Sequence, residues 1–165
     1  MAAVASLTVL SIAALTGAPP ARAANESPVL SAPLEPLAVE RLASLPQRPW
    51  LAGHRGLDLS ARVGQPVGAP AAGVVTFVGF VVDRPVLSIR HSQGLVSSFE
   101  PIDSELAVGD TVDRGQLVGT VATVQRHCSP KTCLHWGVRL GGMYVDPLDY
   151  LEGFGPVTLL PSASG

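Results

Sequence analysis

A histidine on a predicted strand is the first residue of this sequence that could do chemistry. Residues 134–140 are mostly apolar, aromatic or β-branched and are followed by two glycines, which is typical of a β-strand. Residues i and i+2 of a strand share a face, so Cys133 and His135 point to the same side. A histidine on a rigid strand is a good metal ligand, but it needs partners. The candidates lie upstream, in His54-Arg55-Gly56-Leu57-Asp58.

The composition favours one turn-rich β domain. The chain has 165 residues, with 17 glycines, 15 prolines and only 15% charged residues, which leaves little room for long helices. Lys131 is the only lysine, and the formal net charge is −2. Nucleic acid is therefore excluded as a partner, because the chain has no basic patch to meet the phosphates.

The first 23 residues have the pattern of a secretory signal. Residues 1–17 are small and apolar, a pair of prolines follows, and Ala21-Arg22-Ala23 matches the small-x-small rule for signal peptidase. We expect cleavage after Ala23, a mature chain without a membrane span, and a location that is secreted or associated with the cell wall. The segment lacks a basic start, and an uncleaved anchor is the alternative, although an apolar run of about 15 residues is short for a span.

The two cysteines fit an oxidising compartment. Cys128 and Cys133 lie five positions apart, and a secreted chain with two cysteines predicts one disulfide. The bond would hold the loop between them beside His135.

The rest of the chain predicts strands that alternate with turns. Residues 24–48, rich in proline, alanine, serine and leucine, are predicted to be a linker with at most a helical turn, residues 49–151 the domain, and residues 152–165 a tail. Turn signals every 8–12 residues favour an antiparallel sheet, a sandwich or a barrel. The predicted strands cover residues 57–59, 73–79, 84–91, 95–99, 111–112, 117–124 and 134–140. Two similar segments, 63–67 and 108–112, predict a β unit in which short hairpins cross over.

Several of these stretches together resemble the lysostaphin/LytM-type zinc endopeptidases, which cut peptide cross-links in bacterial cell walls. The matching residues are His54-Arg55-Gly56-Leu57-Asp58-Leu59, residues 65–75 and 106–120, Leu134-His135-Trp136 and Tyr144-Val145-Asp146-Pro147. The resemblance covers roughly residues 50–150. It implies an all-β fold, a compact antiparallel sheet or sandwich of the duplicated hybrid motif type. It also implies a bacterial, monomeric protein whose partners are peptidoglycan peptides.

The resemblance further implies a zinc site made by His54, Asp58 and His135. In that family a His-x-x-x-Asp pair binds Zn²⁺ together with the second histidine of His-x-His. Three such ligands leave a fourth tetrahedral position for water, whose pKa zinc lowers to about 7. The alternative for His54 and Asp58 is a surface turn with a salt link to a nearby arginine.

The sequence departs from the family at both catalytic helper positions. The first histidine of His-x-His is Cys133 here, and the histidine of an upstream Tyr-x-His is Pro101. Loss of acid–base help of 10²–10⁴-fold would leave little activity. Three residues are candidates to compensate: His127 beside the disulfide loop, Cys133 itself as a zinc-bound thiolate, and Glu100, which strand alternation aims at the opposite face unless Pro101 causes a bulge.

Two functions therefore stay open. The first is an active zinc endopeptidase, and the second is a non-catalytic module that binds the cell wall or regulates its hydrolases and keeps zinc for structure. Residues 108–112 are also similar to part of the biotinyl/lipoyl carrier domains, but the single lysine is not at the hairpin tip that those domains need. His91 matches a family position that is not a ligand and is predicted to be structural.

Overall fold

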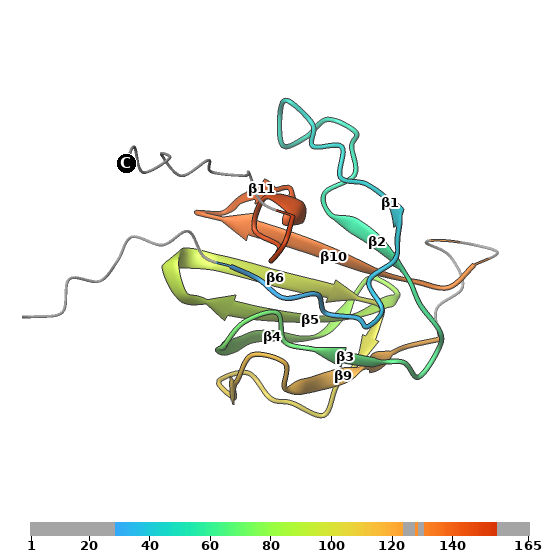
Figure 1. Ribbon diagram of the computed structural model, residues 1–165, viewed down its shortest axis with the longest axis vertical. Helices are drawn as coiled ribbons and strands as arrows, with labels where there is room; N and C mark the ends of the chain where they lie inside the picture. Colours follow the sequence, from blue (N-terminus) through green and yellow to red (C-terminus); the bar gives the residue numbers. More distant parts are fainter. Residues whose placement is uncertain (1–28, 124–127, 129–130, 155–165) are drawn as a thin grey trace, which may run out of the picture.

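Seven strands in a row form the main sheet of the computed structural model, which describes residues 29–123, 128 and 131–154 (Figure 1). All neighbours in this sheet are antiparallel. An eighth strand, β11 (Met143–Val145), pairs with the second half of β10. The order of the seven is β1 (Val39–Arg41), β2 (Leu57–Ser60), β10 (Cys133–Leu140), β6 (Leu95–Glu100), β5 (Arg84–His91), β4 (Gly73–Val81) and β8 (Thr111–Val112).

A second, smaller sheet packs against the first. It consists of β3 (Pro66–Gly68), β9 (Leu117–Val121) and β7 (Ile102–Asp103), in that order. The helical segments of the described chain are two 3-10 turns, η1 (Ser92–Gly94) and η2 (Pro147–Asp149). The predicted all-β antiparallel fold is thus confirmed. None of the helices in the described residues is long and apolar enough to cross a membrane.

The two similar segments exchange their strands, as the sequence predicts. β3 ends the first segment but pairs with β9, which follows the second, whereas β8 ends the second segment and pairs with β4, which follows the first. Each segment turns at a glycine with a left-handed backbone, Gly64 at φ 76° and Gly109 at φ 101°. A side chain at either position would be strained, so glycine is needed to start each crossing hairpin.

Strict alternation divides the main sheet into an inner and an outer face. On β10, Leu134, Trp136 and Val138 are fully buried, and their neighbours His135 and Arg139 point to the other face. β2 and β6 follow the same rule, with Leu57, Leu59 and Phe99 in the core. The core therefore lies between the two sheets, and the outer face of the main sheet carries both polar and apolar side chains, among them Ser88, Ser98 and Phe77.

The described part of the predicted linker belongs to the domain. Leu30 and Leu34 are fully buried in the core, and β1 pairs with β2, so the segment contains a strand where the sequence predicts at most a helical turn. The Leu30 amide donates to Tyr150 (2.7 Å), and its carbonyl accepts from Glu152 (2.8 Å). Prolines at 33 and 36 favour extended backbone at the residues before them, so the segment runs along the sheet edge. Residues 24–28 lie outside the described chain.

His91 is structural, at the centre of a buried hydrogen-bond chain. Its Nδ1–H donates to the Ala72 carbonyl (3.1 Å) and its Nε2 accepts from the Ser97 hydroxyl (3.0 Å), which in turn accepts from the Trp136 indole (3.3 Å). Burial lowers the pKa of His91 from its ordinary value of 6.5. This chain fixes the neutral tautomer and ties β5 and β6 to β10.

Removing the Leu34 side chain tests whether the segment before β2 is part of the domain. We expect Leu34→Ala to lower the free energy of unfolding by about 2–5 kcal/mol, because a fully buried leucine leaves a cavity. Leu42→Ala is the matched control, since Leu42 is 60% exposed and its loss changes stability by about 0.5 kcal/mol or less. Urea unfolding measures the free energy of unfolding of both variants. Equal small changes would show that the segment is a linker and not part of the domain.

The pH dependence of stability tests the role of His91. Below pH 6.5 the unfolded chain binds a proton that folded His91 resists, so the free energy of unfolding falls as the pH is lowered through this range. We expect His91→Gln to show a smaller decrease between pH 7.5 and pH 5 than the parent, both in EDTA so that metal binding does not contribute. An identical decrease in the two proteins would contradict this assignment.

Candidate metal centre

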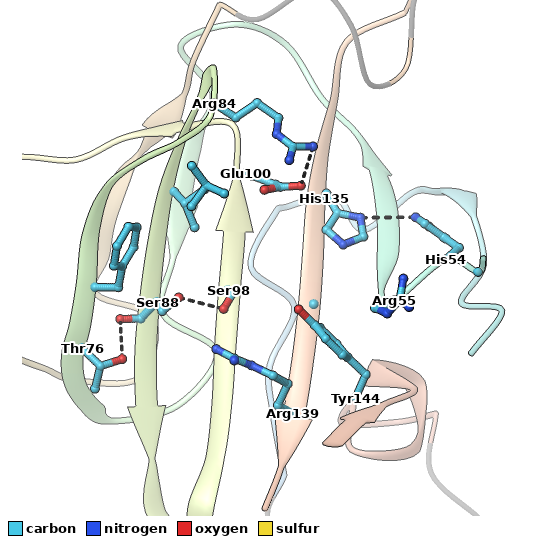
Figure 2. Close-up of a pocket in the computed structure, with 15 residues that line it drawn as sticks. His54, Arg55, Thr76, Arg84, Ser88, Ser98, Glu100, His135, Arg139 and Tyr144 are labelled. Carbon is cyan, nitrogen blue, oxygen red and sulfur yellow. Dashed lines mark hydrogen bonds and ion pairs between the residues drawn. The ribbon is translucent and has the colours of Figure 1, made fainter. Parts of the chain in front are cut away.

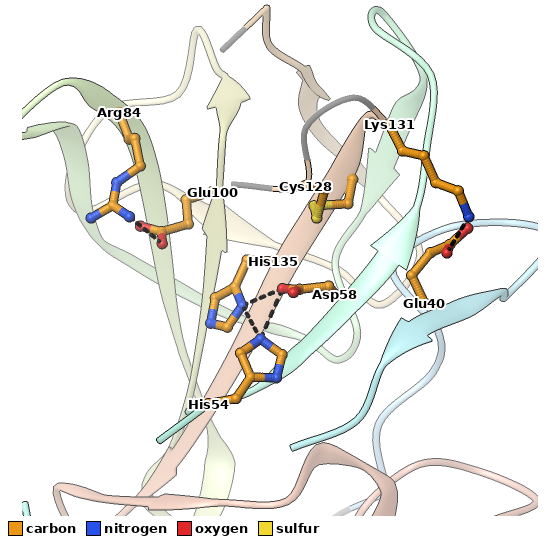
Figure 3. Close-up of a disulfide and its surroundings, with 9 residues drawn as sticks. Glu40, His54, Asp58, Arg84, Glu100, Cys128, Lys131 and His135 are labelled. Carbon is orange, nitrogen blue, oxygen red and sulfur yellow. Dashed lines mark hydrogen bonds and ion pairs between the residues drawn. A yellow bond between two sulfur atoms is a disulfide. The ribbon is translucent and has the colours of Figure 1, made fainter. Parts of the chain in front are cut away.

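Three side chains that can bind a metal converge beside β2 and β10. His135 is the direct cross-strand partner of Asp58, and His54 lies four residues before Asp58, where its backbone bridges to Ser44. Asp58 Oδ1 lies 2.8 Å from His135 Nδ1 and 2.9 Å from His54 Nε2, and the two histidine nitrogens are 3.2 Å apart (Figure 3). The structure thus brings together the residues that the sequence predicts as ligands.

The surroundings of His54 orient its ring toward the other two ligands. Its Nδ1–H donates to the Leu42 carbonyl at 2.7 Å, and a carbonyl can only accept. In the neutral tautomer Nε2 therefore presents a lone pair to the centre, as in histidines whose second nitrogen is held by an outer partner. His54 and Asp58 are 4% and 2% exposed, so the alternative of a surface turn does not hold.

The donor set fits a divalent cation. Two imidazole nitrogens and a buried carboxylate oxygen are ligands that zinc accepts, and three protein ligands leave a position open. A buried carboxylate costs free energy unless positive charge compensates it. A cation at this point would supply that charge.

A groove of about 630 Å³, lined by both polar and apolar side chains, runs over the outer face of the main sheet beside the centre (Figure 2). Its floor includes Ser88 and Ser98, whose hydroxyls are hydrogen-bonded at 2.8 Å, and Gly137 on β10. His54 and His135 both line the groove, and the side chain of His135 is 13% exposed. A ligand lying in the groove would therefore reach the centre.

Glu100 lies in this groove, which corrects the expectation that it points away. It alternates with Phe99, whose side chain is buried in the core, and it is the direct cross-strand partner of His135. Arg84 Nη1 lies 3.3 Å from the Glu100 carboxylate, and both side chains are partly exposed, at 32% and 21%. The groove thus carries a carboxylate and a guanidinium next to a metal ligand.

The helper positions of the family hold residues that do not exchange protons. Cys133 is joined to Cys128 in a disulfide, with Cα atoms 5.9 Å apart, so its sulfur offers no thiolate in this state. Pro101 is buried and contributes only its carbonyl, which accepts from Ala122 at 3.1 Å. His127, the other proposed helper, lies outside the described residues.

The disulfide loop is attached to the rest of the domain near the centre. The two sulfurs and an Asp58 oxygen lie within 4.8 Å of one another. Lys131 follows Cys128 in the loop and makes a 2.7 Å ion pair with Glu40 of β1, which lowers the pKa of that carboxyl. The loop is thereby held beside Asp58 from the side opposite Glu100 (Figure 3).

Sequence reasoning missed several groove residues. Arg84, Arg139 and Tyr144 all line the groove, and the sequence predicted a role for none of them, although Tyr144 begins the matching stretch Tyr144-Val145-Asp146-Pro147. A signal did exist for Arg139, because residues 135, 137 and 139 of a strand share one face. Tyr144 gave no such signal, since its position over Gly137 depends on the pairing of β11 with β10.

Comparison with known proteins places the chain in a family. The model for "Peptidase family M23" matches residues 52–147, which include all three ligands of the centre. An uncharacterized protein of Mycobacterium tuberculosis is 39% identical over 155 residues, which are 91% of this chain and 61% of that protein. The chain therefore spans about three fifths of the length of that relative.

Two further matches agree with this family. A peptidoglycan DD-endopeptidase of Vibrio cholerae is 30% identical over 96 residues, covering 57% of this chain and 22% of that protein. The solution structure of lysostaphin superposes with a TM-score of 0.62 at 18% identity, covering 85% of this chain and 62% of that one, so the fold is lysostaphin-like. The matched motifs, the fold and the converging ligands lead to one assignment: the chain belongs to peptidase family M23.

Proposed function

We propose that this protein is a zinc-dependent endopeptidase of the bacterial cell wall, secreted and monomeric, that acts slowly on peptidoglycan peptides. The convergence of His54, Asp58 and His135 at the side of an open groove is the observation that carries the proposal. The relative from Vibrio cholerae, which is named a peptidoglycan DD-endopeptidase, supports the substrate class.

The chain's own residues would divide the work as follows. His54, Asp58 and His135 hold the ion, which when bound would polarise the scissile carbonyl and activate a water molecule. The groove floor orients the peptide across the centre. Glu100, opposite His135, offers a carboxylate that can accept a proton, and Arg84 offers N–H donors for developing negative charge.

Slow turnover follows from the helper positions. Cys133 in a disulfide and Pro101 can neither take a proton nor donate a hydrogen bond from a side chain. His127 and Glu100 are the two residues that we propose as substitutes. Carboxyl groups are ordinarily weaker bases than imidazoles, so a carboxylate in the place of a histidine restores only part of the lost assistance.

The second candidate function is a non-catalytic module that binds the wall or regulates its hydrolases, with a structural zinc site. The observation in its favour is that both family helpers are replaced while all three ligands are present. The two functions share the metal site and differ in turnover, so they are separated by measuring both.

Zinc content tests the ligand set. We expect about one zinc per mature chain by atomic emission, and almost none in His135→Ala or Asp58→Asn, because two ligands hold the ion poorly. Asp113→Asn is the control, since Asp113 is exposed and outside the groove. Unchanged zinc stoichiometry in His135→Ala would show that the ligands are assigned wrongly.

Turnover of purified peptidoglycan by the zinc-loaded protein tests the activity and its helper. We expect slow release of peptides that stops when zinc is removed. Glu100→Gln and His127→Ala are compared, and the helper is the residue whose replacement lowers the rate by about 10²-fold while zinc stays bound. Glu105→Gln, exposed and outside the groove, is the control.

The outcomes separate the two functions. Absence of release by the zinc-loaded parent, with peptidoglycan still bound, would favour the non-catalytic module. Robust release that neither Glu100→Gln nor His127→Ala reduces would show that the helper lies elsewhere in the chain.

A further inference from the structure

The groove contains three arginines, and two of them already have acceptors. Arg55 Nη2 donates to the carbonyls of Pro49 (2.6 Å) and Leu51 (2.9 Å), which ties it to the loop before β2. Arg84 is paired with Glu100 across the groove. These guanidiniums are therefore engaged in holding the protein's own structure.

The third arginine of the groove, Arg139, differs from Arg55 and Arg84 in its partners. Its guanidinium carbon lies 5.8 Å from the centre of the Tyr144 ring, and within the described chain it makes no ion pair and no hydrogen bond. Figure 2 shows the side chain extended across the groove floor, with the Tyr144 hydroxyl pointing into the groove near it. A half-buried guanidinium stacked on an aromatic ring keeps its planar fork of donors available to a ligand.

Strand geometry sets the distance between the backbone positions of Arg139 and His135. Residues 135, 137 and 139 share the groove face, and four residues of strand span about 13 Å. An extended peptide of about four residues has the same length, so one ligand can reach both points.

Gly137 lies between these two points on β10, and its neighbours pack closely over it. A Cβ on Gly137 would lie 3.1 Å from the Arg55 carbonyl oxygen and 3.4 Å from the Tyr144 ring, so the position is close to its neighbours even without a side chain. Because Gly137 has no side chain, the Tyr144 ring and the Arg55 carbonyl can pack against β10 between His135 and Arg139.

The two parts of the groove differ in charge. Beside His135, the Arg84–Glu100 pair is neutral as a unit. Near Arg139 the described groove residues supply a guanidinium and a phenol but no carboxylate. An anionic group of a ligand is therefore favoured at Arg139 and not at Glu100, which gives the groove a direction.

We propose that Arg139 and Tyr144 form a subsite for a free carboxylate, so that the groove selects peptides with a carboxylate a few residues from the bond presented to the centre. Arginine binds carboxylate through two parallel N–H donors, and the phenol adds a third. The inference rests on the proposed peptide substrate and deepens it. The carboxylate comes either from the C-terminus of the peptide or from an acidic side chain.

Peptide binding to the zinc-loaded protein tests the subsite. The probes are three fluorescein-labelled peptidoglycan stem peptides: one with all carboxylates free, one with the C-terminus as carboxamide, and one with the diaminopimelate side-chain carboxylate as carboxamide. Fluorescence anisotropy measures their affinities. We expect one of the two amidations to weaken binding about tenfold or more, since a charge-assisted hydrogen bond is lost, and the sensitive position identifies the source.

The variants connect this loss to Arg139. We expect Arg139→Gln to bind all three peptides with the same weak affinity, Arg139→Lys to keep part of the discrimination, and Tyr144→Phe to lose a smaller part. Arg62→Gln, exposed and outside the groove, should behave like the parent. Zinc content and the unfolding transition of each variant show that it is folded.

Three results would overturn the subsite. Arg139→Gln could discriminate between the free and amidated peptides as well as the parent does, the parent could bind all three peptides equally, or the parent could bind none of them. Failure of the proposed peptidase is a different result, because it is measured by release from peptidoglycan. The parent protein could release no peptide and still bind peptides in a carboxylate-dependent way that Arg139→Gln abolishes. This result would support the subsite and contradict the peptidase function.

Discussion

The antiparallel register between β2 and β10 is the constraint on which the candidate site depends. It places Asp58 opposite His135, so a carboxylate and an imidazole meet at 2.8 Å, and His54 closes the set at 2.9 Å. A slip by one residue would move His135 into the core and Trp136 to the groove. The buried Leu134, Trp136 and Val138 therefore hold the candidate metal ligands in place from the other face of the strand. Alternate residues of β10 thus pack in the core and face the candidate site.

The two helper positions, Cys133 and Pro101, differ from the histidines of the family. Cys133 shares a face with His135, but its sulfur is bonded to Cys128, and the disulfide borders Asp58. The bond stiffens the side of the centre where an acid–base group would be useful. On the other side of His135, β6 supplies Glu100 and β5 supplies Arg84. The polar groups that remain are thus gathered on the β6 side of the ligands.

The sequence was sufficient to single out three candidate ligands that converge in the structure and to predict most long strands, but it was insufficient for the groove. His54, Asp58 and His135 were found because motif spacing and strand alternation are local properties. β1, β3, β7 and β11 have two or three residues each, too few for any periodicity. Glu100 was misplaced because its face was taken from Pro101 and not from the buried Phe99. The sequence of residues 24–48 did not reveal that Leu30 and Leu34 complete the core. Their burial depends on contacts with residues far along the chain, near Leu151.

The direction of the groove follows from the same alternation that builds the core. On β10, every second residue faces outward, and these residues are a candidate metal ligand, a glycine and a cation: His135, Gly137 and Arg139. β11 then returns beside β10 and lays Tyr144 over the glycine, where the ring supports the guanidinium. A peptide that runs along β10 would therefore meet a metal centre at one end and a positive charge at the other. Main-chain pairing fixes the order of these positions, so the spacing between the Cα atoms of His135 and Arg139 is set by the sheet, and the contact with Tyr144 places the guanidinium.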